Sequence, residues 1–100
     1  MFIEMKLNDF IGHAEEAANL FKSLANPLRL KLLYALAEGE KSVGELASML
    51  SARDSTVSQH LALLRKDGAV ANRRNAQTIF YHLSDKKISR LIEALREFYP

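Results

Sequence analysis

Residues 42–68 read SVGELASMLSARDSTVSQHLALLRKDG, and this stretch decides the fold that we expect. Ser42 and Glu45 have the spacing of a capping box, in which the serine hydroxyl accepts from the Glu45 N–H and the glutamate reaches back to Ser42. This signature predicts a short helix from Ser42 to about Met49.

A second helix, over about residues 54–66, follows within a few residues. Val57, Leu61 and Leu64 recur at helical spacing and mark its buried face, and Gly68 is placed to end it in a left-handed conformation. Two helices joined by a tight turn, the second with an open polar side, are typical of a helix-turn-helix.

Directly downstream the hydrophobic period changes to that of strands. Residues 69–73 and 78–83 are predicted as two strands joined by a polar tip, because β-forming residues alternate there. A helix-turn-helix followed at once by a basic hairpin, over about residues 69–83, is the winged-helix arrangement.

The flanking segments predict further helices. An alanine-rich stripe indicates a helix over about residues 9–24, Asn26 and Pro27 are typical of the start of the next helix, and Ser84 is the expected cap of a last helix over about residues 85–99. The expected fold is mainly α with a small β-hairpin: a single winged helix-turn-helix domain over residues 1–100, with four helices, two strands and a fifth helix.

The composition excludes several function classes. The chain has 100 residues, no cysteine and a formal charge of +2, so disulfides, thiolate metal sites and cysteine nucleophiles are excluded. No apolar run is long enough for a membrane span. The first six residues lack the features of a signal peptide, so we expect a cytoplasmic protein. No glycine-rich phosphate loop or nucleophile–base pair is present, and we do not expect an enzyme.

The charge is uneven along the chain. Residues 51–82 carry +3, whereas residues 1–50 carry −2. A basic segment of this kind suits a polyanion, although a bias this small is also found on an ordinary solvated face.

The leading end of the helix over about residues 54–66 carries short hydroxyls and an amide, which suit the edges of bases in the major groove of double-stranded DNA. Gln59 can pair with adenine through two hydrogen bonds, and His60 is either a phosphate contact or a packing group. The alternative interpretation of this face is a solvated polar surface.

Basic and polar residues of the hairpin could reach the DNA backbone or minor groove. The candidate DNA-binding residues are Ser55, Thr56, Ser58, Gln59, His60, Arg65, Arg73, Arg74, Asn75 and Gln77.

Several motifs in this order resemble the ArsR/SmtB family of winged helix-turn-helix transcriptional regulators, over nearly the whole chain. The segments that carry the resemblance are LANPLRL (24–30), SVGELA (42–47), STVSQHL (55–61), LRKDG (64–68) and RRNAQTIFY (73–81). They are most similar to the subgroup that contains HlyU, BigR, SqrR and NolR.

The resemblance implies a homodimeric repressor that binds an imperfect inverted repeat in double-stranded DNA, with the helices over about residues 9–24 and 85–99 as the dimer interface. The apolar stripes of these two helices independently favour burial in a two-fold interface, the alternative being that both pack in the monomer core. The alternative function is a protein-interaction or anti-repressor module with the same fold and weak DNA specificity.

The sequence departs from the family pattern at several positions. Arg53 stands where relatives commonly have a capping serine, so Asp54 or Ser51 is expected to take over the cap. The family's metal ligands are missing, and Lys87 stands in place of one ligand histidine, so we expect no metal and no cofactor. Tyr34 stands where redox-sensing relatives have a cysteine, which excludes a thiol switch. The effector, if there is one, is left open.

Overall fold

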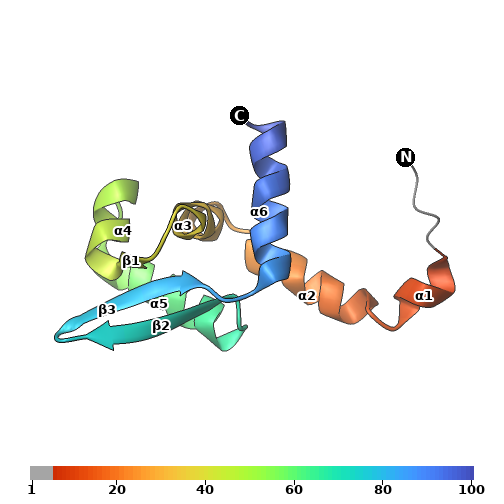
Figure 1. The fold of residues 1–100 in the computed structure, drawn as a ribbon, viewed down its shortest axis with the longest axis horizontal. Helices are drawn as coiled ribbons and strands as arrows, with labels where there is room; N and C mark the ends of the chain where they lie inside the picture. Colours follow the sequence, from red (N-terminus) through yellow and green to blue (C-terminus); the bar gives the residue numbers. More distant parts are fainter. Residues whose placement is uncertain (1–5) are drawn as a thin grey trace.

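A computed structural model of the protein describes residues 6–100; residues 1–5, on which most of the expectation of no signal peptide rests, lie outside the described residues. Helices α1 to α6 and strands β1 to β3 follow in the order α1–α2–α3–β1–α4–α5–β2–β3–α6. Their bounds are α1 Leu7–Ile11, α2 Ala14–Leu24, α3 Pro27–Ala37, β1 Lys41–Ser42, α4 Val43–Leu50, α5 Asp54–Lys66, β2 Val70–Asn75, β3 Thr78–Leu83 and α6 Lys86–Phe98. This is the winged helix-turn-helix predicted from the sequence, with α4 and α5 as the helix pair and β2–β3 as the hairpin (Figure 1).

Side-chain caps explain where α3, α4 and α6 begin. The Asn26 side chain accepts from two backbone N–H groups at the start of α3, and Ser42 and Glu45 form the predicted capping box at the start of α4. Gly68, with φ of 79°, follows the end of α5 as expected. The expected cap of the last helix is wrong, because Asp85 rather than Ser84 accepts from the helix, at the Lys87 N–H. The Ser84 hydroxyl donates instead to the Gly68 carbonyl, at 2.8 Å.

The predicted helix over about residues 9–24 is two helices in the structure. α1 ends at Ile11, and α2 begins at Ala14. Between them the His13 N–H donates to the Phe10 carbonyl at 2.8 Å, which closes a tight turn around Gly12. Glycine disfavours a helix interior by about 1 kcal/mol relative to alanine. Since α1 buries no residue in this chain, no packing offsets that cost.

The hairpin is part of a three-stranded antiparallel sheet with strand order β1–β3–β2. The two-residue strand β1 was not predicted; Ser42 pairs with Phe80 on β3, and Phe80 pairs with Arg73 on β2. β2 also continues to Asn75, so the hairpin tip is shorter than the predicted tip over residues 74–77.

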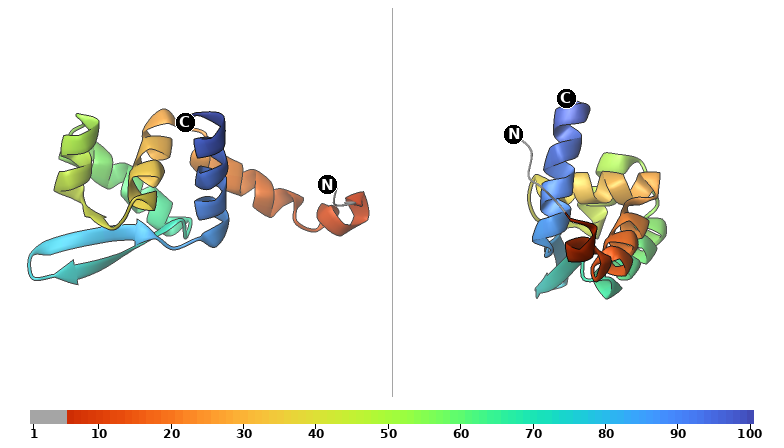
Figure 2. Two further views of the ribbon diagram at one scale, coloured as in Figure 1. Left: turned by 45° about the horizontal axis from the view of Figure 1, so that its top comes forward. Right: turned by 90° about the vertical axis from the view of Figure 1, so that its right-hand side faces the viewer.

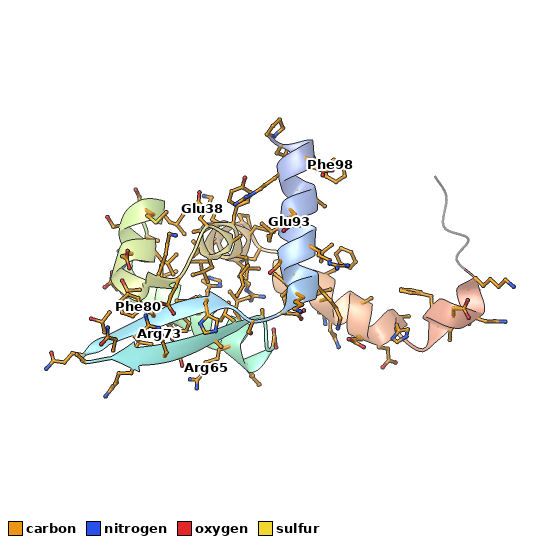
Figure 3. The ribbon with its side chains drawn as sticks, viewed as in Figure 1. Glu38, Arg65, Arg73, Phe80, Glu93 and Phe98 are labelled. Carbon is orange, nitrogen blue, oxygen red and sulfur yellow. The ribbon has the colours of Figure 1, made fainter. Side chains whose placement is uncertain are left out.

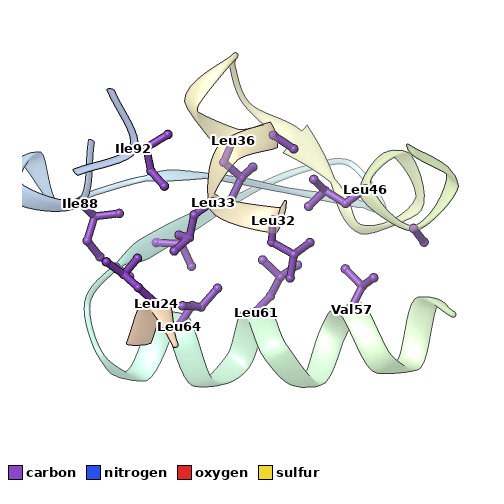
Figure 4. Packing of buried hydrophobic residues seen from close by; sticks show 14 residues of the cluster. Leu24, Leu32, Leu33, Leu36, Leu46, Val57, Leu61, Leu64, Ile88 and Ile92 are labelled. Atoms are coloured by element: carbon purple, nitrogen blue, oxygen red, sulfur yellow. The ribbon is translucent and has the colours of Figure 1, made fainter. Parts of the chain in front are cut away.

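The core lies between α5, α3 and α6 and extends to the base of the hairpin. Val57, Leu61 and Leu64 of α5 are fully buried and point toward the leucines of α3 (Figure 4). Ile88 and Ile92 of α6 are buried at one end of the same cluster. Burying each such side chain stabilises the fold by about 1.5–3 kcal/mol, so the helix-turn-helix is fixed on its inner side and keeps its other side exposed.

The molecule is elongated, with extents of 49 × 29 × 21 Å. The hairpin extends from one end, whereas α1 and α2 form an arm at the other end and α6 rises between them (Figures 1 and 2). No helix within residues 6–100 has the length and apolar character needed to cross a bilayer.

Candidate DNA-binding surface

The first two turns of α5 present the predicted polar residues away from the core. Ser55, Ser58 and Gln59 are exposed, and Thr56 is half-buried at the edge of the buried face. This division follows from the helical period, because Val57 and the two buried leucines that follow it turn the intervening positions outward. The exposed polar face is therefore the outer side of a helix whose inner side is fully buried in the core.

His60 lies half-buried between α5 and α3. Its Nδ1 atom accepts from the Arg29 Nε at 3.4 Å. This contact connects the middle of α5 to the first turns of α3. Of the two roles expected for His60, a packing group has this placement.

The start of α5 differs from what the sequence predicted. Arg53 occupies the cap position in extended conformation, and its side chain makes no capping hydrogen bond. Neither expected substitute takes that role: Asp54 lies inside the first turn, and Ser51, with φ of 51°, closes α4. The helix still begins at Asp54, because the Val57 N–H donates to the Arg53 carbonyl at 3.0 Å and the carboxylate of Asp54 suits the positive helix end.

The tip of the hairpin carries the other predicted group. Arg74, Asn75 and Gln77 are exposed there, and Arg65 is exposed in the last turn of α5. Side chains alternate between the two faces of a sheet. Because Val70 is buried in the core, Arg74 lies on the same sheet face as the core, and Arg73 lies on the outer face.

The side chain of Arg73 interacts with two other side chains of the protein, Glu40 and Phe80. Figure 3 labels Arg73 and Phe80, and the Arg73 guanidinium lies 5.0 Å from the centre of the Phe80 ring. The guanidinium also donates three hydrogen bonds to the Glu40 carboxylate, the shortest at 2.6 Å. These hydrogen bonds are the main cause that lowers the pKa of Glu40 and raises the pKa of Arg73. The two groups are thus charged together at neutral pH.

The structure thus separates the ten predicted residues into the exposed face of α5, with His60 beneath it, the hairpin tip, and Arg73 on the outer sheet face. Sequence reasoning missed Glu40 as the partner of Arg73, since 33 positions separate the two and no local motif connects them. Within residues 6–100, no three His, Asp or Glu side chains are grouped so that they could hold a metal ion.

The sequence is similar to those of known bacterial regulatory proteins. Residues 26–71 match the family described as "Bacterial regulatory protein, arsR family". The chain is 44% identical to the transcriptional activator HlyU of Vibrio cholerae, with 95% of this chain and 88% of that protein covered. It is 54% identical to a biofilm growth-associated repressor of Agrobacterium fabrum, with 92% and 79% covered.

Solved structures agree with these sequence relatives. The transcriptional repressor BigR from Xylella fastidiosa superposes with a TM-score of 0.90 at 43% identity, with 96% of this chain and 98% of that chain covered. NolR from Sinorhizobium fredii superposes with a TM-score of 0.80 at 37% identity, with 98% and 97% covered.

Proposed function

This chain belongs to the ArsR family of bacterial regulatory proteins and is a DNA-binding transcriptional regulator, and from that premise we propose that it acts as a homodimeric repressor of an imperfect inverted repeat. In this proposal the two α5 helices of the dimer enter successive major grooves on one side of double-stranded DNA.

The observation that carries the dimer proposal is the apolar surface that the winged core leaves uncovered. The inner residues of the two predicted stripes, such as Leu24 and Ile92, pack in the monomer core. The outer residues stay accessible, and Phe98 is 73% exposed. The other large apolar residues exposed on α1, on α2 and at the end of α6 are Leu7, Phe10, Ile11, Phe21 and Tyr99. Soluble monomers rarely expose extended apolar patches, and a two-fold interface would cover the same residues in both copies.

The DNA contacts follow from the exposed face of α5 and from the hairpin tip. We assign base contacts to Gln59, which can bond adenine N6 and N7 together, and to the hydroxyls of Ser55, Thr56 and Ser58. We assign contacts with the DNA backbone and the minor groove to Arg65, Arg74, Asn75 and Gln77. His60 has a packing role in this proposal, because it contacts Arg29 of α3. Arg73 is already paired with Glu40, and its role is a different one.

The proposal includes three further statements. The relatives are regulators and not enzymes, and we propose that this chain likewise acts by binding alone. Because its proposed partner is chromosomal DNA, we propose that the protein is cytoplasmic. Since the sequence has no cysteine, release from DNA does not use a thiol.

The test begins with selection of DNA from a random-sequence duplex library by the purified wild-type chain. We expect enrichment of one inverted repeat, with binding that weakens as salt is raised and with two chains per duplex. Sedimentation of the complex measures the number of chains. No preference over random duplex would refute the sequence-specific regulator, and one chain on a single half-site would refute the dimer.

A further inference from the structure

We propose that Glu40 and Arg73 form a strap across β3 that fixes the wing relative to the helix-turn-helix, so that Glu40 is a positioning residue for DNA recognition. This inference rests on the proposed function, because it concerns how the wing is presented to DNA.

The strap spans all three strands of the sheet. In the register, Arg73 of β2 stands opposite Phe80 of β3, and Phe80 stands opposite Ser42 of β1. The guanidinium of Arg73 lies over the Phe80 ring, 5.0 Å from its centre, and reaches Glu40 beyond it. There the Nε donates to both carboxylate oxygens, at 3.1 and 2.9 Å, and Nη2 donates to Oε1 at 2.6 Å.

The far end of the strap lies beside the start of the helix-turn-helix. Glu40 directly precedes β1, and Ser42 of β1 is also the residue that caps α4. A connection from Arg73 to Glu40 therefore joins the wing to the first helix of the DNA-binding pair. Since β1 has only two residues, its backbone pairing alone gives the wing a short attachment on this side.

The strap is also the outermost side-chain attachment of the wing. Beyond Arg73 the residues of β2 and the first two residues of β3 are exposed, and within residues 6–100 no side-chain hydrogen bond or ion pair lies nearer the tip. His82 lies on the same outer face, with its Nδ1 3.8 Å from the Glu40 carboxylate, and is the other basic group beside Glu40. The position of the tip thus depends on how the wing is held at Arg73.

A positioning role and a direct phosphate contact predict opposite results for the same variants. Removing one negative charge ordinarily strengthens binding to DNA, because the carboxylate repels phosphate. If Glu40 holds the wing, Glu40→Gln instead weakens binding. Exposed ion pairs stabilise a fold only slightly, so this variant should remain folded.

The experiment measures binding by fluorescence anisotropy to the inverted-repeat duplex that the wild-type chain selects from a random library, with a random duplex as reference. We expect Glu40→Gln to bind the repeat roughly five- to tenfold more weakly, within the range found for coupled residues in contact. Glu38→Gln is the matched control, because Glu38 is an exposed acid two positions away with no ion pair in the described part of the chain. It should bind as the wild type does, or slightly more tightly.

Two further variants separate positioning from charge. Arg73→Lys keeps the positive charge but cannot reproduce the planar fork over an aromatic ring, so it should lose affinity as Glu40→Gln does. A phosphate contact by Arg73 would instead leave the lysine variant close to wild type. The double exchange Glu40→Arg with Arg73→Glu should recover most of the lost affinity, which a general structural defect would not allow.

The strap is refuted if Glu40→Gln binds the repeat as tightly as Glu38→Gln. If the wild type selects no sequence at all, the proposed function fails, and the strap is then tested in the free protein. In that case amide hydrogen exchange in β2 and β3 should be faster in Glu40→Gln than in Glu38→Gln, and equal exchange in the two variants overturns the strap.

Discussion

Replacing Phe98 by alanine should dissociate the proposed dimer while leaving the winged fold intact. Phe98 is the last residue of α6, it is 73% exposed, and it projects from the side of α6 that faces away from α3 (Figure 3). Its side chain therefore contributes little to the monomer core. Contact with another molecule would bury this apolar surface.

The magnitude follows from that exposed area. A phenylalanine carries about 200 Å² of surface, so roughly 150 Å² is accessible on Phe98. At about 25 cal/mol per Å², complete burial stabilises an interface by about 3.5 kcal/mol, and the change to alanine removes about 2 kcal/mol of that. Both copies lose it in a two-fold dimer, so the upper limit is about 4 kcal/mol, or a thousandfold in the dissociation constant. Burial of half the area gives about thirtyfold.

Sedimentation velocity over a series of concentrations measures this dissociation constant. Met49→Ala is the matched control, because Met49 is 52% exposed but lies on α4, at the end of the molecule opposite α1 (Figure 1). Circular dichroism should show both variants folded. The reasoning is refuted if the two variants dimerise with the same dissociation constant, or if the wild type is monomeric at every concentration reached.

Three further predictions address recognition, folding and pH. Gln59→Ala should lose about 1–3 kcal/mol of discrimination at one base step per half-site, whereas Arg74→Ala should weaken binding evenly and lower the salt slope by about one; equal loss of specificity in both variants would contradict this division. Asn26→Ala should lower the free energy of unfolding in urea by about 1–2 kcal/mol, because its Oδ1 accepts from two N–H groups of α3 at 3.0 and 3.1 Å, and an unchanged midpoint would contradict that. Hydrogen bonds from Ser42, chiefly from its backbone N–H, lower the pKa of Glu45 below 4.5. The stabilisation by the capping box is therefore fully present above pH 4.5, and it is lost as the pH falls through the lowered pKa. Glu45→Gln should therefore flatten the loss of stability on acidification, measured by urea unfolding at several pH values, and a parallel loss in both proteins would count against this linkage.

The features that could be predicted from the sequence are those decided within a few residues. Asn26 caps the residues directly after it, Ser42 and Glu45 are three positions apart, and Gly68 ends α5 because it lacks a Cβ. The spacing of Val57 and the leucines that follow it likewise fixes which side of α5 is buried, and so which polar side chains are exposed. Which of those side chains contact bases stays a prediction, since no local rule decides how a helix lies on DNA.

The features that could not be predicted depend on partners far along the chain or on small energy differences. The two residues of β1 carry no strand signal and pair only because β3 passes beside them. The pairing of Arg73 with Glu40 could not be predicted, because 33 positions separate the two residues in sequence. That Arg73 contacts DNA stays a prediction. The break at Gly12 reflects the small cost of glycine inside a helix. Packing of α1 against the core would offset that cost, but α1 has no buried residue.

The internal pairing of Arg73 changes what the charge of the basic segment can do. Residues 51–82 carry +3, but Glu40, which neutralises Arg73, lies outside that segment, so each copy offers a net charge of about +2 toward DNA. Each phosphate neutralised makes the slope of log affinity against log salt more negative by about 0.9, and a dimer with so few cations should show a shallow slope. On the proposed function, discrimination then depends on the neutral side chains of α5 and on the position of the wing. Substitutions at Gln59 and Glu40 should for this reason alter sequence preference more than the loss of Arg74, although Gln59 carries no charge and Glu40→Gln changes the net charge by one unit, as the loss of Arg74 does.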